Sequence, residues 1–177
     1  SVLSSSAQYG DMLRAQEKFA AATGTNMQTV ARELQNTTKF AINFQEAAQF
    51  SSIGRLAGFT TEQVKKLAQI GTSAATILGR DVPDALSRMF RGVAKGEPEI
   101  LDELGIFIRL DNAYKEYVKT VAKGQRVIDL TAAQRRQATF LAAEQAGKPM
   151  AEGNADAQIN DIIKAQANFT NALKDTM

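Results

Sequence analysis

The strongest constraint in this sequence is a helical periodicity between Met27 and Ser51, where eight residues recur at alternating intervals of three and four. This is the heptad spacing of a coiled-coil seam, although its partly small and polar filling predicts only loose packing. The seam consists of Met27, Val30, Leu34, Thr37, Ala41, Phe44, Ala48 and Ser51. We therefore expect a coiled-coil-like helical arm over residues 1–57.

The same region is poor in charge. From Leu34 to Thr61 the charged residues are Lys39, Glu46 and Arg55 alone. A helix with so few charges is usually covered on more than one face, either by its own domain or by copies of itself. Two interpretations therefore stay open: the seam binds a partner, which includes other copies of this chain, or it is simply buried.

Composition removes most catalytic chemistry from consideration. The 177 residues include no Cys, no His and no Trp, and their formal net charge is only +2. Without Cys or His, thiolate catalysis and the commonest general base and metal ligands are missing. We therefore expect no enzymatic activity, no catalytic residues, no cofactor and no metal site, and the small net charge does not indicate a specific nucleic-acid binder.

Residues 58–147 carry the signals of a compact module with several helices. Thr60 and Gln63 fit a capping box, and Asp81 fits an N-cap with Pro83 in the first turn of its helix. Thr131 fits another N-cap, before a helix predicted over residues 132–146. A last helix, leaving the module, is expected within residues 148–177.

One short β pairing is also compatible with the pattern. Residues 105–110 form a β-branched and aromatic run, and residues 126–130 are the expected partner strand, with a helix over 111–123 between them. The predicted fold class is therefore all-α, a long helical arm plus a compact multi-helix module, with at most this one two-stranded pairing.

Acidic residues gather at positions 97–103, after two arginines. Acids at a helix N-terminus interact favourably with the helix dipole, by ~0.3–1 kcal/mol each, and no nucleophile accompanies them here. A structural role is therefore favoured over acid–base catalysis. The expected ion pairs join basic to acidic members of one set: Arg88, Arg91, Glu97, Glu99 and Glu103.

A composite of short motifs resembles the tail tape measure proteins of long-tailed bacteriophages. Residues 78–88 read LGRDVPDALSR and residues 91–106 read RGVAKGEPEILDELGI. The pattern continues through residues 108–111 and resumes at residues 130–138, LTAAQRRQA. The resemblance covers about residues 60–145, roughly half of the chain, while the flanking helices match only in style.

The resemblance implies structural work. Tape measure proteins are long helical chains that set tail length during assembly and leave the tube during genome delivery. The implied partners are other copies of the chain, tail tube and tail assembly proteins, and host envelope proteins met on ejection. The implied location is the lumen of the virion tail, with the host cytoplasm during assembly. The alternative is a helical protein-interaction or effector module without catalysis.

The start of the chain shows no secretion signal, because residues 1–6 are small and polar rather than basic and then apolar. The longest uncharged stretches run to about 13 residues, short of the ~20 that a membrane span requires. We expect a soluble segment cut from a longer protein.

Overall fold

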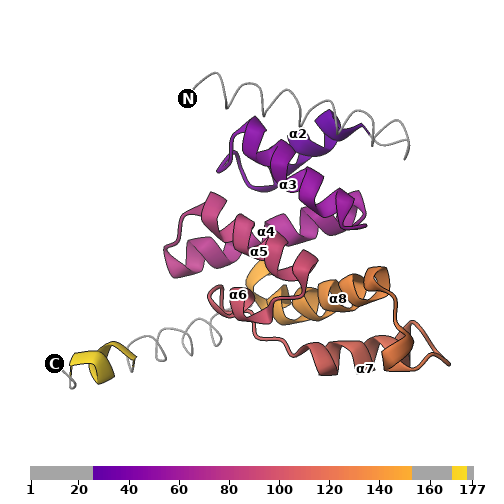
Figure 1. The fold of residues 1–177 in the computed structure, drawn as a ribbon. Helices are drawn as coiled ribbons and strands as arrows, with labels where there is room; N and C mark the ends of the chain where they lie inside the picture. Colours follow the sequence, from indigo (N-terminus) through magenta and orange to yellow (C-terminus); the bar gives the residue numbers. More distant parts are fainter. Residues whose placement is uncertain (1–25, 153–168, 175–177) are drawn as a thin grey trace, which may run out of the picture.

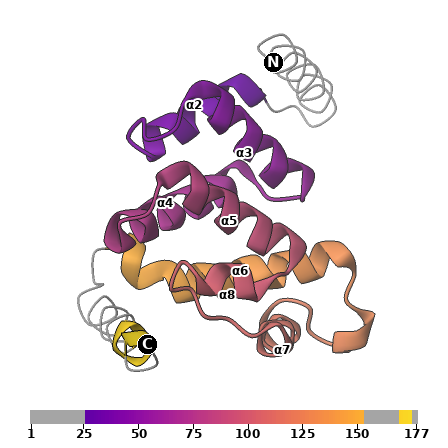
Figure 2. The same ribbon diagram turned by 60° about the vertical axis from the view of Figure 1, so that its left-hand side comes forward.

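The computed structural model describes residues 26–152 and 169–174. Within these residues the secondary structure is entirely helical, which confirms the all-α class. The helices pack as three stacked layers (Figures 1 and 2). The first layer is α2 (Met27–Thr37) with α3 (Phe44–Leu56), and the second is α4 (Thr61–Leu78) with α5 (Val82–Lys95).

The third layer holds α7 (Leu110–Thr120) and α8 (Ala132–Ala151). Short α6 (Pro98–Asp102) packs beside α5, and the 3₁₀ turn η1 (Val127–Asp129) lies between α7 and α8. The middle layer is covered on both sides, because α2 and α3 pack on it from one side and α8 from the other.

One hydrophobic core runs through all three layers. Its fully buried members include Leu34 of the first layer, Leu67 and Phe90 of the second, and Phe140 of the third. Phe59, in the connection between α3 and α4, has its ring 5.7 Å from that of Phe140. The expected domain boundary at residue 57 therefore falls inside a continuous core.

The expectation of a long helical arm is wrong for its described part. Residues 38–43 turn the chain back between α2 and α3, and Lys39 and Phe40 adopt left-handed backbone conformations with φ of 55° and 60°. Asn43 then caps α3 through a capping box with Glu46. The heptad spacing concealed this turn, because Ala41 and Phe44 keep the three-four register across it. Residues 1–25 of the expected arm lie outside the described residues.

The expected β pairing is also wrong, since the part of the chain that the structure describes contains no strand. Residues 105–109 are non-helical, and Ile106 fills the core while its N–H donates to Leu101 O. The intended partner segment instead folds into η1, which Arg126 closes by an ion pair to Asp129. Hydrogen bonds within local turns thus take the place of the β-ladder hydrogen bonds that the prediction required.

The predicted helix starts are confirmed. Thr60 and Thr131 each form a capping box, and the Asp81 side chain accepts from the N–H of Asp84. Gly79 and Gly96 end α4 and α5 in left-handed conformations. These signals were reliable because each satisfies helix-end backbone groups with neighbouring residues.

Two helix ends differ from the prediction. Helix α7 ends at Thr120 rather than at residue 123, where Ala122 turns into a small core. Helix α8 passes the expected end at 146 and includes Pro149, because Gly147 and Met150 pack into the core beyond it. Residues 148–151 therefore belong to α8 rather than to an outgoing helix. Residues 169–174 are helical, and 153–168 lie outside the described residues.

Candidate interaction surfaces

The predicted seam does not form a free surface. Five of its eight members are buried, and they include Leu34 and Ala48, both fully enclosed. Thr37 and Phe44 are partly buried, and Ala41, in the turn, is exposed. Of the two interpretations left open by the sequence, burial within the chain's own domain is correct for the described fold. Self-association through a continuous Met27–Ser51 seam would require this core to open.

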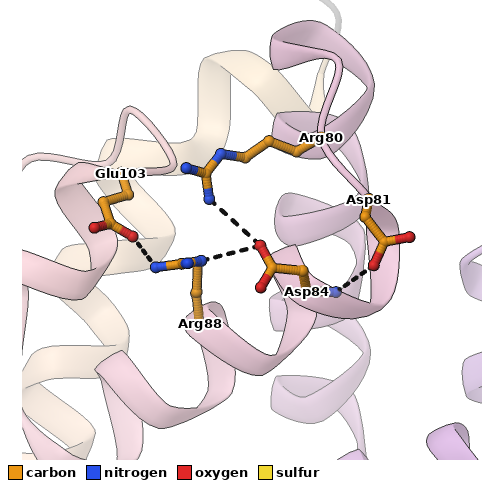
Figure 3. Close-up of polar contacts among 5 residues, drawn as sticks. All are labelled: Arg80, Asp81, Asp84, Arg88 and Glu103. Atoms are coloured by element: carbon orange, nitrogen blue, oxygen red, sulfur yellow. Dashed lines mark hydrogen bonds and ion pairs between the residues drawn. The ribbon is translucent and has the colours of Figure 1, made fainter.

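A polar network does form where the sequence predicted ion pairs. Asp84 accepts from Arg88 Nε at 3.0 Å and lies 3.5 Å from Arg80 Nη1 (Figure 3). Arg88 also reaches Glu103, so it joins α5 to the residue that follows α6. These side chains are about one-third to one-half exposed, and ion pairs of that exposure typically contribute ~0–1 kcal/mol.

The other predicted members stay outside this network. Among the described residues, Arg91, Glu97 and Glu99 form no ion pair within 4.0 Å. Arg91 points away from the core on the exposed side of α5, and Glu97 begins α6 without a side-chain cap. The arrangement fixes the α5–α6 corner rather than building a binding site.

Among the described residues, Asp111 and Lys66 have shifted pKa values, and both shifts have local structural causes. The N–H of Asn112 donates to the Asp111 carboxylate at 2.9 Å and lowers the pKa of that group, with a further contribution from Arg109. Lys66 pairs with Glu144 at 2.8 Å between α4 and α8, which raises the pKa of Lys66. Neither belongs to a nucleophile–base pair, so the shifts reflect a local hydrogen bond in the first turn of α7 and an ion pair between α4 and α8.

The described ranges, 26–152 and 169–174, contain no group of three or more His, Cys, Asp or Glu that could hold a metal ion. None of their helices combines the length and apolar character needed to cross a bilayer.

An open groove of about 1200 Å³ lies between α7 and α8. Phe107 and Leu141 line it and are 66% and 39% exposed, and buried Tyr117 also lines it. Arg109 and Glu144 stand among its polar lining residues. The sequence did not single out Phe107 as a groove residue, because the groove exists only once α7 and α8 are packed side by side.

No protein-family model matches the chain. No solved structure matches it either. Functional inference therefore rests on the motifs and on the geometry described above.

Proposed function

We propose that this chain is a structural segment of a phage tail tape measure protein. In this role it contributes to tail length during assembly and leaves the tube during genome delivery. The role is mechanical and requires no catalytic residue. Its partners are other copies of the chain and proteins of the tail tube and its assembly. In the host, envelope proteins are the partners proposed for the ejection step.

The observation that carries the proposal is the behaviour of the motif residues in the fold. The stretch over residues 78–106, which resembles the tape measure family, makes one continuous corner from the end of α4 through α5 to the end of α6. Gly79 and Gly96 end the two long helices, and Asp81 caps the second. The motif residues thus have identifiable folding roles, which supports a structural meaning for the resemblance.

Close packing inside the corner gives the same support. A Cβ built on Gly92 would lie 2.7 Å from Leu101 Cδ2, closer than side-chain carbons approach. Only glycine lets α5 and α6 approach in this way. Arg88 and Glu103 then clasp the same corner from its exposed side. The residues that carry the resemblance are therefore used for packing, capping and pairing.

The mode of packing must differ from the one that the seam suggested. A tape of parallel copies held by Met27–Ser51 would compete with the core that buries most of those residues. We propose that the three-layer fold persists when the segment is free. Inside a tail, either the tube accommodates the folded layers or the layers unpack into extended helix.

The direct test is the protein content of virions of the phage that encodes the chain. Peptides from residues 26–152 should be detected by mass spectrometry in purified intact particles, at a ratio to tube protein that stays constant between preparations. The same peptides should be depleted from particles emptied by triggered ejection, while tube peptides remain. Absence of these peptides from intact particles would contradict the proposal.

The α7–α8 groove favours the second candidate function, a helical protein-interaction module. Phe107 and Leu141 expose apolar surface beside polar groups, which is typical of a groove for a partner helix. Phe107→Asp should then abolish partner binding while circular dichroism shows unchanged helix content. A chain that never enters particles but retains a groove-dependent partner would favour this alternative.

A further inference from the structure

We propose that the connection between α7 and α8 docks the protein on an anionic membrane surface. The basic tip, as we name it, consists of Lys119, Val121, Lys123, Ile128 and Arg135. It lies at the end of the third layer, where the chain leaves α7 and turns into α8 (Figures 1 and 2). The inference does not depend on the tape measure assignment.

Positive charge is concentrated at this place. Residues 26–114 carry ten basic and ten acidic side chains, so they balance. Residues 115–136 carry six basic and only two acidic side chains. The small net charge of the whole chain therefore conceals a local excess around the α7–α8 connection, and local excess is what attracts a protein to anionic lipid.

Two of these six cations are already engaged, and three of the other four belong to the tip. Arg126 pairs with Asp129 at 2.9 Å, and Arg136 donates to Ala57 O at 2.8 Å. Lys119, Lys123 and Arg135 are exposed and form no ion pair with any residue in the described ranges. Their charges are therefore available to an external anion.

Two aliphatic side chains project from the same connection. Val121 is 56% exposed and Ile128 is 72% exposed. They sit on a fixed base, because neighbouring Ala122 and Leu130 are buried in a small cluster with Tyr117. A hydrogen bond of 2.8 Å from Gln134 to Gln125 further ties the connection to the start of α8. The Val121 and Ile128 side chains are thus held exposed to solvent by a folded base.

The combination selects among anionic partners. Phosphate contacts alone would suit nucleic acid, but that partner gains little from exposed Val and Ile, and single strands are usually held by stacking on aromatic side chains. The tip has no aromatic residue. Exposed aliphatics flanked by Lys and Arg match a bilayer interface, where apolar groups enter the headgroup boundary and cations meet anionic lipid. Contact through a loop needs no spanning helix.

The experiment is sedimentation of the full 177-residue chain with sucrose-loaded vesicles. One set is phosphatidylcholine alone and the other contains about one-third phosphatidylglycerol, an anionic lipid. We expect binding to the anionic set only, weakened by added salt. Lys119→Gln with Lys123→Gln should reduce the partition coefficient about thirtyfold, at roughly tenfold or less for each lost cation. Val121→Ser with Ile128→Ser should reduce it about tenfold or more.

Matched variants separate the tip from general surface effects. Lys95→Gln removes an exposed cation elsewhere, and Phe40→Ser removes an apolar side chain that is 68% exposed in the first layer. Both should bind like the parent, and circular dichroism should show unchanged helix content in every variant. Equal binding to neutral vesicles, no binding to either set, or equal losses in the control variants would each overturn the proposal. Binding of duplex DNA that needs the lysines but not Val121 and Ile128, without vesicle binding, would assign the tip to nucleic acid instead.

Discussion

The ring of Phe50 in α3 stacks on the ring of Phe90 in α5, with centroids 5.6 Å apart and planes inclined by 11°. This contact fastens the first layer of helices to the second. Phe50 lies within residues 1–57, whose periodicity predicted a helical arm. Phe50 was not a member of the predicted seam, and it is 5% exposed. This contact helps to explain why the seam residues are buried inside the domain and are not available to bind a second copy of the chain.

Truncation of Phe50 should destabilise the whole fold. Phe50→Ala removes a buried ring and leaves a cavity, which typically costs ~3–5 kcal/mol. The check is equilibrium urea unfolding followed by circular dichroism, and the transition should stay single because the layers share one core. Phe40→Ala, at an exposed ring, should change the free energy of unfolding by no more than about 0.5 kcal/mol. An unchanged transition in Phe50→Ala would show that the first layer is not coupled to the second.

Gly147 should resist substitution because of Ile70. A Cβ at Gly147 would lie 2.5 Å from Ile70 Cγ2, where α8 crosses α4. Alanine improves helix propensity by up to ~1 kcal/mol, but overpacking costs ~1–3 kcal/mol, so Gly147→Ala should be net destabilising. In an Ile70→Ala background the same change should become neutral or stabilising. A double-mutant cycle from urea unfolding measures this coupling, and additivity would contradict the contact.

The Arg88–Glu103 pair should contribute little to stability. Its side chains are 30% and 48% exposed, so Glu103→Gln should lower the free energy of unfolding by at most ~1 kcal/mol. The loss should shrink as salt is added, because salt screens exposed pairs. Glu116→Gln, on an exposed acid of α7 that forms no ion pair among the described residues, serves as the control and should change the free energy of unfolding by no more than about 0.5 kcal/mol. A loss of several kcal/mol would mean that the corner depends on this pair far more than its exposure implies.

Asp111 should make the protein less stable in acid. The Asn112 N–H, and then Arg109, favour the charged carboxylate and lower its pKa below the ordinary value. A carboxyl with a lowered folded-state pKa adds stability above its unfolded-state pKa, and this stability is lost as pH falls through the folded-state pKa. Carboxyl NMR titration should find the lowered pKa. Arg109→Gln should restore it only in part, since the backbone hydrogen bond is the larger cause; full restoration would contradict that order.

Local signals in the sequence predicted much of the fold. Thr60, Asp81 and Thr131 start helices as expected, because a capping side chain acts on backbone only two or three residues away. The sequence predicted that arginines and acids of this region form ion pairs, and Arg88 and Glu103 form one of them. Gly79 and Gly96 end helices for an equally local reason.

The failures concern one local turn and several relations between distant residues. The turn at Lys39 and Phe40 requires left-handed backbone at two residues that rarely adopt it, so nothing in their identity announces it. Whether Ile106 joins a strand or a core depends on the helices that surround it. The α7–α8 groove likewise exists only after two helices are placed side by side. Periodicity predicts which residues are covered, but it does not say by what.

The central functional claim is that this segment contributes to the length of a phage tail. The most direct measurement is tail length by electron microscopy after in-frame deletion of residues 26–152 from the encoding phage. The account predicts assembled tails that are shorter than those of the parent, by up to about 190 Å if the segment runs as continuous helix at ~1.5 Å per residue. Intact tails of unchanged length would contradict it.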